Sequence, residues 1–234
     1  MNPRRVAVAI PAYQAAPSVA DVARRALGQI PQVLVIDDGS TDGTADAARA
    51  AGVRVISHPG NRGKGAAMRT AFDDLFPRGF EAVVTVDADA QHPPEEIPKL
   101  LAAWELGADL VMGVRDQQFA EMFWVRRLSN RLSSRGISLL AGQLLPDVQT
   151  GFRLYTRALY AQLGMPEDRF EAESAIVVRA VRAGFPVACT PVHLACADGR
   201  TTSHYRPLID SLRIARAVIR ARMETRSWTR ASSS

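Results

Sequence analysis

The chain has 234 residues and a formal net charge of +5 at neutral pH, with 47% hydrophobic and 23% charged residues. This composition is ordinary for a globular protein that can bury a substantial core. Aromatic residues make up only 6%, which argues against a nucleic-acid module built on base stacking. No apolar run approaches the ~18 residues of a transmembrane helix, so we expect none.

The positive charge is carried almost entirely by arginine, since the only lysines are Lys64 and Lys99. Arginine binds phosphate in a bidentate manner, so anionic partners are expected. The two cysteines, Cys189 and Cys196, have no metal-binding spacing and form no disulfide framework. They favour a reducing compartment, and we expect a cytoplasmic protein.

The first half of the chain alternates strand and helix patterns. We expect strands over 6–10, 33–36, 53–57, 83–86 and 109–112, and helices over 18–28, 44–51, 66–75 and 95–106. Ser18 followed by Asp21 predicts a capping box at the start of the first helix. Such alternation predicts right-handed crossovers and a mostly parallel α/β sheet. A further strand pair is expected near 187–197.

Each expected strand ends in polar or glycine-rich residues, and ligands bind at the carboxyl edge of such a sheet. Neither a G-x-G-x-x-G turn nor a Walker A loop is present. The alternative, that these residues only end strands, explains the glycines and prolines better than the acid pairs. We expect one crevice lined by Pro11, Tyr13, Asp37, Asp38, Arg62, Lys64, Asp87, Asp89 and Arg115.

The most informative stretch follows the strand at 83–86. Asp87 and Asp89 come directly after it, with the carboxamide of Gln91 nearby. Oxygen ligands of this kind suit Mg²⁺ or Mn²⁺, and such a cation would favour a diphosphate ligand. The alternative is a solvated turn, in which aspartate is common.

Taken in order, these motifs resemble family 2 glycosyltransferases of the GT-A fold, and within them the dolichol- or polyprenol-phosphate sugar synthases. The resemblance covers residues 5 to about 185 and implies a Rossmann-like catalytic domain. One departure is Gln14-Ala15, where the family often has Asn-Glu, so the nucleotide base stays open. The matching segments are 11–13, 37–44, 61–65, 87–93, 113–115 and 149–153.

The resemblance also implies roles for individual residues. The nucleotide sugar would be held by Pro11, Tyr13, Asp38, Lys64, Asp87 and Ala88. The Mg²⁺ or Mn²⁺ ion would be held by Asp87, Asp89 and Gln91. The candidate catalytic residues are Asp89, Asp147 and Arg115, and the acceptor phosphate would be bound by Arg115, Arg126, Asn130 and Arg200.

The reaction implied is an inverting, metal-dependent transfer of a hexose from a donor of the GDP-mannose or UDP-glucose type to polyprenyl or dolichyl phosphate. One alternative keeps the donor and uses a hydroxyl acceptor, with Asp147 as the base. A more distant alternative is a nucleotide-sugar-binding or nucleotidyltransferase-like domain. Glu171 and Glu173 begin a helix, where acids suit the helix dipole as well as they suit catalysis. Oligomeric state stays open.

Residues 207–226 predict an amphipathic helix, followed by Trp228. We therefore divide the chain into a catalytic domain, 1–200, and a basic helix and tail, 201–234. Such a helix either lies on a membrane surface or packs on the domain. With the arginine-aromatic cluster at 115–135, we favour peripheral association at the inner face of the membrane. The expected apolar stripe is Leu208, Ile209, Leu212, Ala215 and Ile219, and the basic face is Arg213, Arg216, Arg220 and Arg222.

Overall fold

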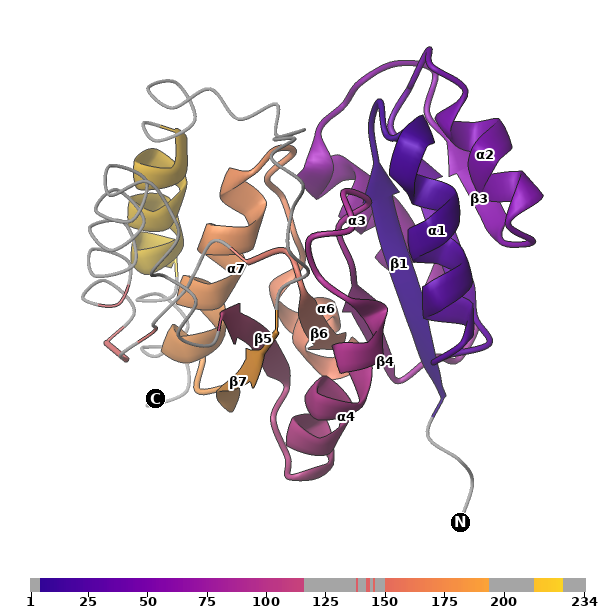
Figure 1. Cartoon of the computed structure of the whole chain (residues 1–234). Helices are drawn as coiled ribbons and strands as arrows, with labels where there is room; N and C mark the ends of the chain where they lie inside the picture. Colours follow the sequence, from indigo (N-terminus) through magenta and orange to yellow (C-terminus); the bar gives the residue numbers. More distant parts are fainter. Residues whose placement is uncertain are drawn as a thin grey trace, which may run out of the picture.

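The computed structural model describes residues 5–115, 138, 142–143, 145, 150–193 and 213–224. Within these residues one sheet has seven strands in the order β3-β2-β1-β4-β6-β5-β7 (Figure 1). All neighbours pair in parallel except β6, which is antiparallel to both β4 and β5. The strands are β1 Val6–Ala12, β2 Val33–Asp37, β3 Arg54–Ser57, β4 Ala82–Thr85, β5 Leu110–Arg115, β6 Arg153–Thr156 and β7 Val187–Val192. The predicted mostly parallel α/β sheet is confirmed.

Helices connect these strands and cover both faces of the sheet (Figure 1). Residues 213–224 are also helical and lie beside α7. The others are α1 Ala16–Leu27, α2 Thr44–Ala50, α3 Lys64–Leu75, η1 Pro94–Glu96 (a 3₁₀ turn), α4 Ile97–Glu105, α6 Arg157–Leu163 and α7 Glu171–Arg182.

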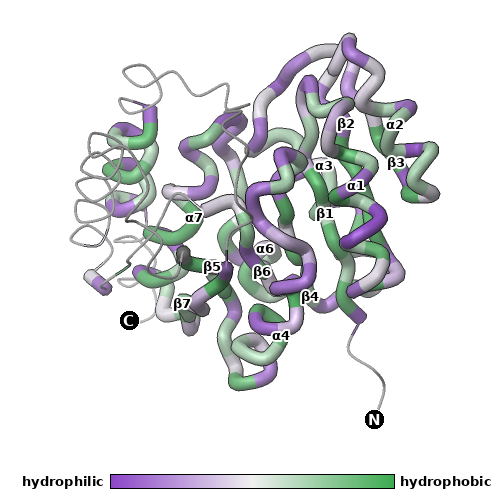
Figure 2. The backbone as a smooth tube through the Cα atoms, in the orientation of Figure 1, coloured by the Kyte–Doolittle hydropathy of each residue, from purple (hydrophilic) through white to green (hydrophobic). Residues whose placement is uncertain are grey.

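Successive side chains of a strand point to opposite faces of the sheet, and the buried side chains therefore form two cores, one on each face. Ala7 and Ala9 of β1 face a core built with α3, α6, α7 and the helix 213–224. Val8 and Ile10 face the opposite core, built with α1, α2 and α4. This is the two-residue period of a strand that is buried on both faces. In Figure 2 hydrophobic residues follow the central strands, whereas hydrophilic residues concentrate in loops and on outer turns.

The start of α1 differs from the prediction. The helix begins at Ala16, its N-cap residue Ala15 makes no side-chain capping bond, and Ser18 lies inside it. The predicted capping box is therefore wrong. The amides of Ala15 and Ala16 instead donate to Thr44 Oγ1 (2.8 Å) and Asp42 Oδ2 (3.0 Å), so side chains from a distant loop satisfy this helix end.

The observed boundaries of other elements also differ from the predicted ones. β1 and β5 extend beyond the predicted strands, and α3 begins two residues before the predicted start at residue 66. Near 187–197 the described strand is β7, which pairs with β5 rather than with a sequence neighbour. Residues 194–197 lie outside the described part of the chain.

The described part of the C-terminal helix buries a different face from the predicted one. Ala215 is exposed and Ile219 is 50% exposed, so the predicted stripe is wrong at these two positions. Its other members, and Trp228, lie outside the described residues. The helix packs on the domain through Ile214, Ala217, Val218 and Ala221.

Candidate active site

The candidate site lies at the carboxyl edge of the parallel strands. β1 pairs with β2 on one side and β4 on the other, so the segments that follow all three strands meet there. β6 runs the opposite way, and Arg153 at its start pairs with Thr85 at the end of β4. The segment 150–152 therefore arrives at the same edge as the residues that follow Thr85.

A buried ion-pair cluster occupies this edge. Lys64, the first residue of α3, places Nζ 2.6 Å from Asp87 Oδ1 and 3.0 Å from Glu173 Oε1 of α7. Burial alone would raise the pKa of Asp87, but the charge of Lys64, followed by that of His92, lowers it. Burial is also the largest influence on Glu173, and it raises the pKa of that carboxyl group despite the nearby Lys64.

Gly151 packs against this cluster, and the contact is possible because glycine has no side chain. A Cβ at this position would overlap the Asp87 carboxylate and Lys64 Nζ. The Gly151 carbonyl accepts a hydrogen bond from Thr85 Oγ1 (2.9 Å), and buried Arg153 donates from Nε to the Thr150 carbonyl (2.7 Å). The segment 150–153 thus brings a bare backbone against Asp87 and Lys64, and Arg153 braces that backbone from within the core.

Asp89 has a different environment from Asp87. Its Oδ1 accepts a hydrogen bond from the amide of Gln91 (3.0 Å), in a turn where Ala90 has a φ of 61°. Burial, followed by the charge of Asp87, raises the pKa of Asp89. Among the described residues Asp89 forms no ion pair. Asp89 therefore lies after the end of the strand as a carboxylate without an ion-pair partner among the described residues.

This donor set fits a divalent cation of the Mg²⁺ type. No group of three or more His, Cys, Asp or Glu side chains in the described ranges is arranged to hold a metal by itself. Mg²⁺ is usually held by one or two carboxylates, with substrate phosphates and water completing its shell. Asp89, with the Gln91 carboxamide two residues on, matches that pattern; Asp87 is already paired with Lys64.

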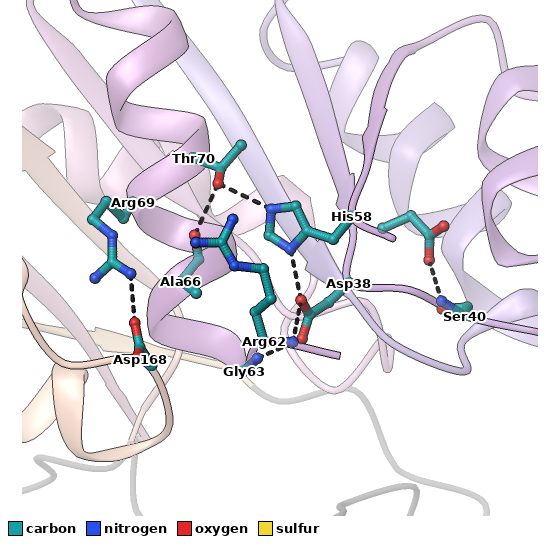
Figure 3. Close-up of polar contacts among 10 residues, drawn as sticks. Asp38, Ser40, His58, Arg62, Gly63, Ala66, Arg69, Thr70 and Asp168 are labelled. Atoms are coloured by element: carbon teal, nitrogen blue, oxygen red, sulfur yellow. Dashed lines mark hydrogen bonds and ion pairs between the residues drawn. The ribbon is translucent and has the colours of Figure 1, made fainter. Parts of the chain in front are cut away.

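Asp38 has a structural task at the end of β2 (Figure 3). Its Oδ1 accepts from the Arg62 amide (3.0 Å) and lies 2.7 Å from His58 Nδ1, and its Oδ2 accepts from the Gly63 amide (2.7 Å). His58 Nε2 lies 3.0 Å from Thr70 Oγ1 on α3. This buried network fixes the glycine-rich loop that delivers Lys64. A nucleotide contact by Asp38 stays a prediction.

The loop after β1 is fastened to the loop after β2. The Gln14 amide donates to Ser40 Oγ (2.9 Å), and the Gln14 side chain exchanges hydrogen bonds with Thr41. Pro11 and Tyr13 are half-buried beside this junction. Ser18 Oγ donates to the carbonyl of Ala88 (2.6 Å), which ties α1 to the Asp87–Asp89 turn.

Several predicted site residues cannot be placed. Asp147, Arg126, Asn130 and Arg200 lie outside the described residues, and only the backbone of Arg115, at the end of β5, is described. Glu173 was considered from the sequence as either a catalytic or a helix-start acid, and its contact with Lys64 is visible only in the structure. His58 was missed as a site component, since nothing in the sequence around it indicates its contact with Asp38.

Comparisons with known proteins place the chain in a family. The profile of glycosyl transferase family 2 matches residues 7–164. Glycosyltransferase AglJ of Haloferax volcanii is 31% identical over 193 residues, which cover 81% of this chain and 63% of that protein. Polyprenol monophosphomannose synthase of Mycolicibacterium smegmatis is 31% identical over 206 residues, covering 81% and 77%.

Solved structures agree on the fold. Glucosyl-3-phosphoglycerate synthase from Mycobacterium tuberculosis superposes with a TM-score of 0.73 at 20% identity, covering 95% of this chain and 78% of that one. The fold is the Rossmann-like GT-A fold.

The chain therefore belongs to glycosyl transferase family 2 and is a glycosyltransferase similar to polyprenol-phosphate sugar synthases. The family and the fold predicted from the sequence are confirmed. In the described ranges no helix combines the length and the apolar character needed to cross a membrane.

Proposed function

We propose that this enzyme is an inverting, divalent-metal-dependent hexosyltransferase that uses a nucleotide-diphosphate sugar as donor and polyprenyl phosphate as acceptor. The observation that carries the proposal is the unequal acid pair after β4. Asp87 forms an ion pair with Lys64, whereas among the described residues Asp89 forms none, and burial with the charge of Asp87 raises its pKa. Similarity to polyprenol monophosphomannose synthase supports the choice of acceptor.

The donor half of the site follows from this arrangement. We assign Asp89 and Gln91 to Mg²⁺ or Mn²⁺; when bound, the cation neutralises the departing diphosphate as a Lewis acid. The glucosyl-3-phosphoglycerate synthase structures contain Mn²⁺ or Mg²⁺ together with UDP, which supports this choice of metal. Asp87 and Lys64 orient the donor rather than hold the metal, since their charges are already paired. Gly151 lets the backbone approach Asp87 and Lys64 closely, which fixes the two groups assigned to the donor.

The remaining donor contacts are proposals from the sequence. Pro11, Tyr13 and Asp38 are assigned to the base and ribose, and Ala88 to the donor through the turn that Ser18 anchors. The buried network around Asp38 supports an indirect part in this, because it fixes the loop preceding Lys64. GDP-mannose and UDP-glucose types stay equal candidates.

A phosphate acceptor simplifies the chemistry. Polyprenyl phosphate is already anionic, so it needs orientation by cations rather than a general base. We assign that task to Arg115, Arg126 and Arg200, with Asn130 as a neutral partner. An acceptor with a hydroxyl group would need a base, and Asp147 is the candidate for it.

The C-terminal helix supports association with a membrane surface. Ala215, Ile219 and Met223 follow each other at intervals of four and are exposed, with Ile219 50% and Met223 61% exposed. Arg216 and Arg220 are exposed on the same helix. An apolar stripe beside arginines suits an anionic lipid surface. We therefore propose a peripheral enzyme at the inner face of the membrane.

The division at residue 200 does not separate two independent units in this proposal. The helix 213–224 shares a core with α3 and α7. Glu224 also pairs with buried Arg179 of α7 at 3.1 Å. The helix is therefore proposed as an appendage of the catalytic domain that presents one face outward.

A thermal-shift screen tests the donor and the metal. GDP-mannose, UDP-glucose and TDP-glucose are each added with and without Mn²⁺. One donor should stabilise the protein in a metal-dependent manner, because a ligand that binds only the folded state raises its stability. Asp89→Asn should abolish the metal-dependent part. No metal-dependent stabilisation by any donor would refute the proposal.

A transfer assay tests the acceptor. Release of the nucleoside diphosphate is measured with the stabilising donor and either polyprenyl phosphate or a panel of sugar and small hydroxylated acceptors. Release should require polyprenyl phosphate, and Asp147→Asn should cause only a modest loss. Near-total loss in Asp147→Asn, or release with a hydroxyl acceptor alone, would favour the alternative reaction.

A further inference from the structure

Glu173 is a buried acid that the proposed chemistry leaves without a task. It lies in the first turn of α7, it is 5% exposed, and its Oε1 is 3.0 Å from Lys64 Nζ. The same Lys64 Nζ lies 2.6 Å from Asp87 Oδ1. One lysine thus joins a carboxylate of the donor turn to a carboxylate of α7.

The backbone holds the two helix starts together. The Ala66 amide donates to the Asp168 carbonyl (2.9 Å), and a Cβ on Gly65 would collide with the Glu167 carbonyl and the Ala172 side chain. Only a glycine permits this approach of α3 to the segment before α7. The contacts of Gly65 and Ala66, rather than those of Lys64 and Glu173 themselves, therefore bring Lys64 and Glu173 together.

Glu173 is also fixed from a second direction. Its backbone carbonyl accepts a hydrogen bond from Arg153 Nη1 (2.5 Å), and Arg153 braces the 150–153 segment that lies against Asp87. The Glu173 backbone is therefore held by β6 while its side chain holds Lys64. A rigidly placed carboxylate is suited to limiting the positions that a flexible lysine can adopt.

Charge explains why a second acid matters. Lys64 is a long side chain with three donors, and its side chain is only 13% exposed. With Asp87 alone, the ammonium could rotate around one carboxylate; between two acids its position is defined. A buried charge that loses a partner is also strongly destabilised.

We infer that Glu173 is a positioning residue for the donor site, acting through Lys64 on Asp87. This inference rests on the proposed function, in which Asp87 and Lys64 orient the donor. The competing explanation is that Glu173 serves only the stability of α7, as an acid near a helix N-terminus does.

The test uses donor binding in the presence of Mn²⁺ and kinetics with both substrates. Glu173→Gln keeps the size of the side chain and removes its charge. We expect the donor dissociation constant and donor KM to rise about tenfold, with kcat changed less than about threefold and acceptor KM unchanged. A purely stabilising role would lower Tm and leave the donor KM unchanged.

A double-mutant cycle tests whether Glu173 acts through Lys64. Donor binding is measured calorimetrically for wild type, Glu173→Gln, Lys64→Met and the double variant, which needs no turnover. If Glu173 acts through Lys64, the glutamine substitution should have no further effect in the Lys64→Met background. Additive effects of the two substitutions on the donor dissociation constant would overturn the inference.

Glu167→Gln is the matched control. It weakens another buried ion pair of the same region, between Glu167 and Arg179 of α7 at 2.5 Å, which includes neither Lys64 nor Asp87. It should lower Tm and leave the donor KM unchanged. If Glu173→Gln fails to fold, Glu173→Asp replaces it, and an unchanged donor constant there counts against the inference. A wild-type protein that binds no donor refutes the proposed function as well, whereas an active protein with an insensitive Glu173 refutes this inference alone.

Discussion

Replacing Gly151 by alanine places a single methyl group against Asp87 and Lys64. The added Cβ would overlap Asp87 Oδ2 and Lys64 Nζ and would lie 2.5 Å from Asp87 Oδ1, whereas 3.4 Å is an ordinary contact. The Asp87 carboxylate, the 150–152 backbone, or both must therefore move by at least about 0.9 Å. The backbone has little freedom to do so, because Thr85 Oγ1 and Arg153 hold it in place.

The expected loss is larger for activity than for stability. Overpacking typically costs about 1–3 kcal/mol, which corresponds to a fall in Tm of about 2–12 °C for a chain of this size. A misplacement of ~1 Å in a catalytic site can cost ~100-fold in rate. We therefore expect kcat/KM for the donor to fall about a hundredfold in a protein that remains folded.

The assay measures nucleoside diphosphate release with the stabilising donor, alongside a melting curve. Gly60→Ala is the matched control, because a Cβ at Gly60 meets nothing within 4 Å. It should leave both activity and Tm near the wild-type values. If Gly151→Ala keeps wild-type activity while folded, Asp87 does not need its observed position, and the assigned geometry of the donor site is wrong.

Three further predictions concern other parts of the chain. His58→Ala removes the contacts to Asp38 and Thr70 (2.7 and 3.0 Å) and should lower the free energy of unfolding by about 2 kcal/mol in urea titrations; a change near zero would show that the network does not hold the loop. Arg54 donates a hydrogen bond to Asp74 and lowers the pKa of the Asp74 carboxyl group. The contribution of this pair to stability is therefore fully present above the pKa of an unfolded aspartate, about 3.9, and is lost as pH falls through the lower pKa that Asp74 has in the folded protein. Asp74→Asn should therefore be less stable than wild type at pH ~7, and the gap should close below pH ~4; a gap that is independent of pH would contradict the assignment. Replacing Ile219 and Met223 together by serine should weaken binding to anionic vesicles about tenfold without lowering Tm. The control is Leu106→Ser, at an apolar side chain that is 91% exposed elsewhere on the protein, and it should bind the vesicles as wild type does. Equal binding by the double variant and the control would exclude this helix as the membrane contact.

The order of helices and strands was readable from the sequence because it depends on local patterns. The β-branched runs at 33–36 and 83–86 are followed by acids and glycines, and strand periodicity with turn chemistry locates such elements without knowledge of their neighbours. The position of Asp87 and Asp89 at the sheet edge followed from the same reasoning. The start of α1 did not, because its amides are satisfied by Asp42 and Thr44 rather than by a nearby Ser18.

Contacts between distant segments were decided only by the tertiary structure. β6 enters between β4 and β5 in the reverse direction, and this brings Gly151 onto Asp87. Glu173 meets Lys64, 109 positions earlier in the sequence, because α3 and α7 start side by side. The helix 213–224 has two apolar stripes, and periodicity alone cannot choose between them, since both satisfy the spacing of a helix face. Packing on α7 buried Ile214, Ala217, Val218 and Ala221, and left Ala215, Ile219 and Met223 exposed.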